Sequence, residues 1–305
     1  MNTKCNHCHS EEFNVYNNYE PLEYGVQLVK CKSCDHIFTL IEEEIDLDRF
    51  YNEGKYVLQD NRGSFFDRVI RLNNLFIVKN IFKLSSNGKR LLDFGSGKGQ
   101  FLALFKKPWE LIGVETSRPR ADFAKTIYGL EIFQEFYEKG VIKGGNYDVI
   151  TLFHVLEHLP SPINLLAEIV EGNLHENGLL VVEVPLIESW QSIIAGPNWI
   201  HLDPPIHLSH YSKMGLSEIL RKLSLEPIRV SFFSLPLGIL GMCQAIMSRF
   251  GYRGKVIEEL KFNRSFKLLL GLSLVAPAAT ILEMAAVLFK KGGIIRVYSR
   301  YTTPI

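Results

Sequence analysis

The amino-acid sequence predicts an α/β fold in which a parallel sheet is covered by helices on both faces. Short apolar segments alternate with segments of helical periodicity from residue 65 onward, and one strand breaks into a glycine-rich turn that opens the next helix. The expected strands are 90–94, 110–115, 130–133, 147–153 and 178–184, and the expected helices are 65–84, 99–107, 117–128 and 162–173. Strands joined by helices run parallel, and ligands bind beyond the carboxyl ends of such strands.

Composition places the chain among globular proteins. Its 305 residues can bury one large core with appendages, its net charge is +1, and 47% of its residues are hydrophobic. A nearly neutral chain has no bulk electrostatic attraction for nucleic acid, so no nucleic-acid partner is expected. The first residues lack an apolar signal region, which leads us to expect a cytoplasmic protein.

Four of the five cysteines lie in the first 34 residues and predict a zinc ribbon over residues 1–40. They form two Cys-x-x-Cys pairs separated by twenty-two residues: Cys5 with Cys8, and Cys31 with Cys34. Four thiolates satisfy tetrahedral Zn²⁺, and a reducing cytosol disfavours disulfides. Three histidines lie beside the pairs and could replace a thiol: His7, His9 and His36. Because four cysteines already satisfy the metal, we expect these histidines to face solvent.

A linker with an acidic run, residues 41–64, joins the ribbon to the main domain, residues 65–305. Its aromatic segment 50–56 could line the mouth of a pocket or pack the linker onto that domain. The sequence leaves these two alternatives open.

The central motif is the glycine turn after the first strand of the sheet. Gly95, Gly97 and Gly99 alternate directly after residues 90–94, where they permit positive φ angles and close approach of a ligand to the backbone. The N–H groups that open the next helix bind a carboxylate or phosphate, so a nucleotide-like ligand is expected. The spacing differs from the G-x-G-x-x-G of dinucleotide-binding proteins. Glu115 ends the second strand, where a carboxylate can accept both hydroxyls of a ribose.

Together with segments 147–160 and 178–185, these motifs resemble the class I S-adenosylmethionine-dependent methyltransferases over roughly residues 65–230. The resemblance implies a Rossmann-like, seven-stranded, mostly parallel sheet and S-adenosylmethionine as cofactor. In that family the donor lies across the glycine turn, with its methionine part at the end of the fourth strand. By position, the implied cofactor-binding residues are Asp93, Gly95, Ser96, Gly97, Gly99, Glu115, Thr116, Phe153 and His154.

The irregular stretch 186–211 predicts a lid or substrate-binding loop, because long ordered loops in compact domains usually have such a role. Methyl transfer to a neutral hydroxyl requires a base, and histidine is the commonest choice. The candidate catalytic residues are His207 and His210 on this loop, and His158 across the cleft. A hydrogen bond that stabilises the lid is the alternative role for each of them.

The segment from His154 to His158 suggests a second metal site. It is similar to the Glu-x-x-Glu-His element that holds a divalent ion in some O-methyltransferases of this family. The expected ligands are His154, Glu157 and His158, and a histidine in place of the first glutamate favours a softer metal than Mg²⁺. Alternatively, Glu157 and His158 simply cap the following helix.

Residues 235–291 form an apolar insertion, expected to be helical, between the last two strands, 226–233 and 293–298. Residues 249–300 carry ten Lys or Arg against three Asp or Glu, which is typical of docking on a membrane surface. Its run 268–289 is long enough to span a bilayer, but spanning would separate two strands of one sheet. A buried helical cap or a homodimer face is the remaining alternative.

The function expected from these features is methyl transfer from S-adenosylmethionine to a small-molecule or glycan acceptor. Oxygen of a saccharide or lipid-linked saccharide is the expected site, by analogy with bacterial enzymes that combine such a ribbon and loop. The expected location is the cytoplasm or the inner face of its membrane. Two alternatives are an RNA methyltransferase with a zinc module and a binding or scaffold protein without catalysis.

Overall fold

The structure is a computed structural model that describes residues 2–16, 22–43, 45–46, 60, 62–85, 88–134 and 140–302. The aromatic segment 50–56, whose role the sequence leaves open, lies outside the described residues.

The main domain is built on a seven-stranded sheet in the order β10-β11-β8-β7-β4-β5-β6. Its strands are β4 (Arg90–Phe94), β5 (Glu110–Val114), β6 (Glu131–Phe133), β7 (Tyr147–Phe153), β8 (Leu174–Pro185), β10 (Leu225–Ser231) and β11 (Ile294–Tyr301). The neighbours from β8 to β6 pair in parallel, whereas β11 is antiparallel to both β8 and β10. The predicted Rossmann-like, mostly parallel sheet is therefore confirmed.

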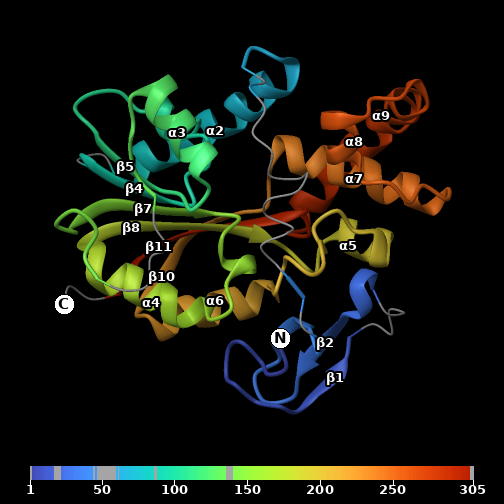
Figure 1. The fold of residues 1–305 in the computed structure, drawn as a ribbon, viewed down its shortest axis with the longest axis horizontal. Helices are drawn as coiled ribbons and strands as arrows, with labels where there is room; N and C mark the ends of the chain where they lie inside the picture. Colours follow the sequence, from blue (N-terminus) through green and yellow to red (C-terminus); the bar gives the residue numbers. More distant parts are fainter. Residues whose placement is uncertain are drawn as a thin grey trace.

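Helices cover both faces of this sheet (Figure 1). On one face lie α2 (Phe65–Leu84) and α3 (Arg118–Tyr128), and on the other lie α4 (Pro162–Asn173) and α6 (Lys213–Lys222). Successive strand residues point to opposite faces, so Leu91 packs under the first pair of helices and Leu92 under the second. Strand segments buried on both sides are mostly apolar, which is the pattern of residues 91–94 in β4, 147–153 in β7 and 178–185 in β8.

One expected helix is wrong. Residues 99–107 form only a short 3-10 turn, η2 (Leu102–Leu104), before β5 begins. Pro108 disfavours helical backbone at the residue before it, so the ten residues between the glycine turn and β5 cannot extend a helix to Lys107.

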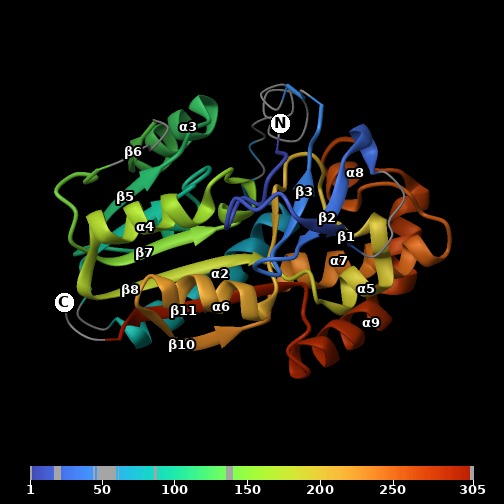
Figure 2. The ribbon, with the colours of Figure 1, turned by 90° about the horizontal axis from the view of Figure 1, so that it is seen from below.

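The cysteine-bearing module is a small antiparallel sheet of β1 (Phe13–Val15), β2 (Gln27–Cys31) and β3 (Ile37–Leu40), with a 3-10 turn η1 (Glu23–Gly25). A fourth strand, β9 (Ser209–His210), comes from the loop 186–211 and pairs with β3. Figure 2 shows this module lying against the same end of the main sheet as α5 (Trp190–Ala195) and α7 (Leu235–Arg249). The loop and the module therefore share one sheet.

The insertion between β10 and β11 is helical, as expected, and consists of α7, α8 (Val256–Phe262) and α9 (Phe266–Leu288). α7 packs on α9, α5 and α2, which joins the insertion to the domain (Figure 1). Glu283, the only acidic residue of α9, is buried and accepts hydrogen bonds from Gly293 N and Gln191 Nε2 at 3.0 and 2.8 Å. Among the described residues, α9 is the one helix long and apolar enough to cross a membrane by length and composition, and only 17% of its apolar window is buried.

Candidate active site

A cavity of about 530 Å³ lies at the carboxyl ends of β4 and β7. Parts of α2, α7 and the loop 186–211 line its walls. Eight of the residues predicted to bind the donor or to act as the base line it: Asp93, Gly95, Ser96, Gly97, Phe153, His154, His158 and His207. Four others do not line it: Gly99, Glu115, Thr116 and His210. The cavity lies where ligands of parallel α/β sheets bind.

The glycine turn requires glycine for two distinct reasons. Gly95 has φ +77°, and a Cβ there would lie 2.5 Å from Val155 Cγ2. Gly99 has φ +74° and packs against Leu130 and Ala124 rather than facing the cavity, because a Cβ would lie 2.5 Å from Leu130 Cδ1. A positive φ and the absence of a Cβ are therefore both needed at Gly95, which lines the cavity, and at Gly99, which does not.

Glu115 follows β5 and is bonded across the glycine turn. Its carboxylate accepts hydrogen bonds from Gly97 N at 2.7 Å and from Ser117 N at 2.8 Å. The sequence therefore placed this carboxylate correctly beside the turn. Its role in binding a ribose stays a prediction, as does that of Thr116.

Asp93, at the end of β4, is buried at the floor of the cavity. Thr151 Oγ1 donates a hydrogen bond to its Oδ1 at 2.6 Å. Burial raises the pKa of Asp93 to about 7, the hydrogen bond from Thr151 opposes this shift, and the charge of Glu115 adds to it. The carboxyl can thus titrate near neutral pH beside the turn where the donor is predicted to bind.

His154, directly after β7, is held between two carboxylates. Its Nδ1 lies 3.1 Å from Glu157 Oε1 and its Nε2 lies 3.0 Å from Glu183 Oε1, and Glu183 pairs in turn with Arg296 of β11. Burial opposes a charge on His154, but the two carboxylates outweigh it and raise its pKa to about 10. The result is a row of alternating charges, Arg296, Glu183, His154 and Glu157, in which His154 is partly exposed and the other three are buried.

This row corrects the predicted ligand set for a second metal. Both ring nitrogens of His154 already bond to carboxylates, so His154 has no lone pair to offer an ion. The side chains whose ligand atoms lie within 4.8 Å of one another are instead Glu157, His158 and His207.

Two of the three candidate bases meet in the cavity, with the rings of His158 and His207 at 4.7 Å between centroids. They meet because Leu208 N donates to Glu157 O at 2.7 Å, which docks the loop on the turn after β7. Burial lowers the pKa of His158 to about 4, so its imidazole is neutral at neutral pH. A neutral imidazole can accept a proton or bind a metal, and the catalytic roles stay predictions.

The third candidate base, His210, points into the ribbon instead of the cavity. Its Nε2 lies 2.9 Å from Thr39 Oγ1, and the Thr39 hydroxyl donates to the carbonyl of His207 at 2.6 Å. Thr39 N also donates to Leu208 O at 3.0 Å, and Asn6 Nδ2 donates to Ser209 Oγ at 2.6 Å. The ribbon thus fixes the loop segment 207–210, and His210 has the stabilising role that the sequence left as its alternative.

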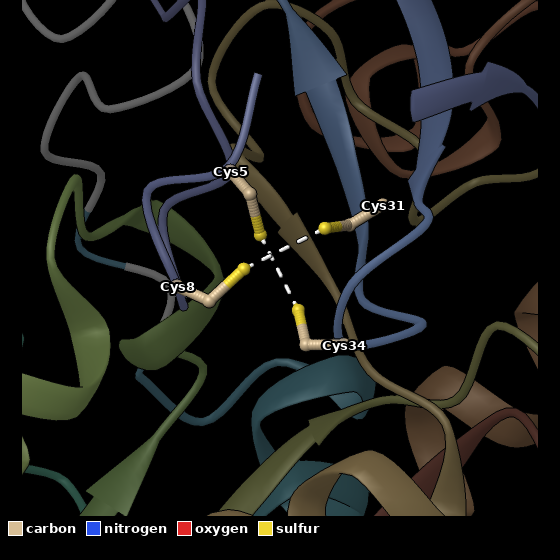
Figure 3. A group of neighbouring side chains, drawn as sticks. All are labelled: Cys5, Cys8, Cys31 and Cys34. Carbon is tan, nitrogen blue, oxygen red and sulfur yellow. Dashed lines mark hydrogen bonds between the residues drawn. The ribbon is translucent and has the colours of Figure 1, made fainter. Parts of the chain in front are cut away.

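The four cysteines come together in the ribbon with their sulfurs pointing at one another (Figure 3). Cys5 Sγ lies 3.5 Å from Cys34 Sγ, and Cys8 Sγ lies 3.6 Å from Cys31 Sγ. Four sulfurs at the usual zinc–sulfur distance are separated by about 3.8 Å, so the cluster has the size of a tetrahedral Zn²⁺ site. These four residues would hold the ion.

The expectation that the neighbouring histidines face solvent holds for His9 but is wrong for His36. His36 is buried and stacks on His7 with 3.2 Å between ring centroids, and both rings lie near Tyr211 of the loop. They pack the ribbon onto the main domain, a contact that no local pattern in the sequence indicates.

Sequence reasoning also missed Thr39, Glu183 and Arg296. A signal was available for two of them, because Glu183 and Arg296 are charged residues with apolar neighbours on both sides in the buried parts of β8 and β11. A charge inside a buried strand requires a partner. The register places Arg296 opposite Glu183 on neighbouring strands, so the two satisfy each other.

Comparisons with known proteins agree with this architecture. A sequence profile of the family described as methyltransferase domain matches residues 68–230, which is more than half of the chain. No curated protein sequence matches the chain. A candidate sarcosine dimethylglycine methyltransferase from Galdieria sulphuraria is 13% identical with a TM-score of 0.50, and the match covers 75% of this chain and 85% of that one.

Two further solved structures are similar. A candidate histamine N-methyltransferase from Thermotoga maritima is 17% identical with a TM-score of 0.49, over 77% of this chain and 90% of that one. The plantazolicin methyltransferase BpumL, solved with S-adenosylhomocysteine and a monoazolic desmethylPZN analogue, is 13% identical with a TM-score of 0.48, over 79% and 86%. The profile match, on a seven-stranded, mostly parallel sheet with the expected glycine turn, shows that the chain belongs to the methyltransferase domain family, as a class I S-adenosylmethionine-dependent methyltransferase.

Proposed function

We propose that the protein transfers the methyl group of S-adenosylmethionine to an oxygen of a saccharide or lipid-linked saccharide. The observation that carries this proposal is a single cavity that joins the glycine turn to two histidines, His158 and His207. Such a cavity can hold the donor at one end and a hydroxyl of the acceptor beside an imidazole at the other. The donor supplies an activated methyl group on a sulfonium, so a new carbon–oxygen bond replaces a carbon–sulfur bond.

The chain's own residues then have two tasks. The turn at Gly95 and Gly97 and the carboxyl of Asp93 orient the donor, while the loop wall orients the acceptor in line with the methyl group. His158 or His207 accepts the proton of the acceptor hydroxyl, since both line the cavity. Four cysteines of the ribbon would hold a structural Zn²⁺, which through β9 fixes the loop segment that carries His207.

The exposed face of α9 supports a lipid-linked acceptor. Leu274, Ile281 and Leu288 are 72%, 71% and 81% exposed, although an exposed helix face of a soluble domain is normally polar. Arg264 and Lys267 flank this face at the start of α9, and Lys290 flanks it at the end.

Charge decides which occupant suits this face best. Two copies of α9 packed face to face would bring basic ends together in either orientation, because both ends are cationic. Anionic headgroups complement both ends, and the apolar face can lie among acyl chains. The proposal is therefore that α9 lies on the surface of an anionic bilayer, where a lipid-linked saccharide would be presented.

The acceptor is tested by incubating the protein with methyl-deuterated S-adenosylmethionine and separated fractions of soluble saccharides, lipid-linked saccharides and RNA. The expected product is a saccharide heavier by one labelled methyl group, formed at least about a hundredfold more slowly by His158→Ala/His207→Ala. Calorimetry with S-adenosylhomocysteine serves as a control for donor binding. Label in RNA alone, or in no fraction while the donor product binds, would contradict the proposed acceptor.

The membrane contact has its own test. We expect the protein to co-sediment with phosphatidylglycerol vesicles. The variant Leu274→Glu/Ile281→Glu is expected to stay in the supernatant. Met214→Glu, at a methionine of α6 that is 81% exposed, is the matched control and should bind vesicles normally. Equal binding by all three proteins, or a dimer in solution that the α9 variant dissociates, would overturn the contact.

A further inference from the structure

We propose that Glu157, His158 and His207 bind a divalent transition-metal ion on the wall of the cavity. One ligand atom from each of these side chains lies within 4.8 Å of those of the other two. A tetrahedral ion with nitrogen and oxygen ligands separates them by roughly 3.4 Å, so a small inward rotation of the side chains would complete the site. All three residues line the cavity, which leaves further coordination positions open to a small ligand.

The hydrogen bonds around His207 prepare it to be a ligand. Its Nδ1 lies 2.7 Å from the carbonyl oxygen of His201, and a carbonyl can only accept, so Nδ1 carries the proton. The ring nitrogen of His207 that can offer a lone pair to an ion is therefore Nε2. Metal-bound histidines almost always donate their other ring N–H in this way.

Glu157 supplies the second, independent observation. Its side chain is 1% exposed, and its two oxygens have different surroundings. Oε1 bonds to His154, whereas Oε2 has no hydrogen-bond partner among the residues that the structure describes. A buried carboxylate oxygen without a partner is costly, and an ion bound between Oε2 and the two imidazoles would remove that cost.

The residues behind Glu157 support it as a ligand. His154 bonds to Glu157 and Glu183, and Glu183 pairs with Arg296, so the row behind the site holds two cations and two anions. This arrangement orients the Glu157 carboxylate in the manner of the hydrogen-bonded residues that support metal ligands elsewhere.

The ligand set also selects the metal. Two imidazoles and one carboxylate suit Zn²⁺, Co²⁺, Fe²⁺ or Mn²⁺ better than Mg²⁺ or Ca²⁺, which prefer oxygen ligands. If the proposed acceptor is correct, on which this step alone rests, the ion would bind the acceptor hydroxyl and lower its pKa. The proton would then pass to solvent water, because an imidazole that binds the ion cannot also accept a proton. Metal binding itself does not depend on that acceptor.

The test is a Co²⁺ titration of the full-length protein with Zn²⁺ already bound at the ribbon. Cobalt held by nitrogen and oxygen absorbs weakly in the visible range, whereas cobalt that displaces ribbon zinc also shows strong near-ultraviolet thiolate bands. We expect one equivalent of Co²⁺ to bind with visible bands only, and the zinc content to stay at one per chain.

Variants locate the ion. Glu157→Gln, which keeps the shape of the side chain, and His207→Ala are each expected to weaken Co²⁺ binding at least about tenfold. His175→Ala removes a histidine outside the cavity and should bind Co²⁺ like the unmodified protein. Circular dichroism checks that each variant is folded. If His207→Ala does not fold, the Co²⁺ affinity of Glu157→Gln alone tests the site. Absence of visible bands, thiolate bands alone, or equal affinity in Glu157→Gln and the unmodified protein would overturn the proposal.

Discussion

Replacing Thr39 with valine is expected to loosen the loop that carries His207. The buried Thr39 hydroxyl donates to His207 O at 2.6 Å, and its oxygen lies 2.9 Å from His210 Nε2, which therefore carries the ring proton. Valine has nearly the same shape, so the substitution removes these two hydrogen bonds without opening a cavity. Each polar group left unsatisfied in a buried site costs about 1–3 kcal/mol, so losing both bonds should lower the free energy of unfolding by about 2–6 kcal/mol.

Urea-induced unfolding, followed by intrinsic fluorescence, measures this change. The matched control is Thr280→Val, because the Thr280 hydroxyl donates to Ala276 O, one turn earlier in its own helix. A carbonyl within a helix already has a backbone partner, so the control should change stability by less than about 0.5 kcal/mol. Amide exchange of residues 207–210 should also accelerate in Thr39→Val alone. If both variants unfold at the same urea concentration, the ribbon does not fix the loop through Thr39.

The remaining predictions concern the turn, the buried charges and the ribbon. Gly95→Ala should lower affinity for S-adenosylhomocysteine at least tenfold by calorimetry, since its Cβ would lie 2.5 Å from Val155 Cγ2; unchanged affinity would contradict the close approach at the turn. Arg296→Met leaves Glu183 without its guanidinium partner and should cost about 3–5 kcal/mol in denaturant unfolding, much of it recovered in Arg296→Met/Glu183→Gln. Burial raises the pKa of Glu183, but Arg296 and His154 outweigh this effect and hold it below 4.5. Its contribution to stability should therefore be complete above pH 4.5 and be lost as the pH falls below that value, a loss that should shrink in Arg296→Met. Removal of zinc by a chelator should expose all four ribbon thiols to a thiol reagent, and protection that persists without metal would show that the ribbon folds unaided.

The local chemistry of the main motifs could be predicted from the sequence. The glycine spacing predicted the turn at Gly95, the acidic strand end predicted a carboxylate beside it at Glu115, and two Cys-x-x-Cys pairs predicted the four-thiol cluster. Each of these features depends on residues close in the chain or on a short repeated unit whose geometry is nearly invariant.

The ligand set predicted for a second metal shows where such reasoning fails. The segment 154–158 predicted His154 as a ligand, but Glu183 and Glu157 engage both of its nitrogens, and His207 lies near Glu157 instead. His207 is fifty residues further along the chain and reaches Glu157 only because Leu208 bonds to the backbone there. His210 and His36 likewise found partners in another part of the molecule.

The sequence by itself determined the mostly parallel sheet, the glycine turn and the cysteine cluster, because periodicity and motif spacing are local properties that backbone geometry translates directly into structure. Only the tertiary structure decided which histidine faces the cavity, which one supports the ribbon, and which carboxylate holds His154. Those assignments depend on how β3 pairs with β9 and on how β11 registers with β8. Such pairings join residues far apart in the chain, and the buried polar groups they bring together must satisfy one another.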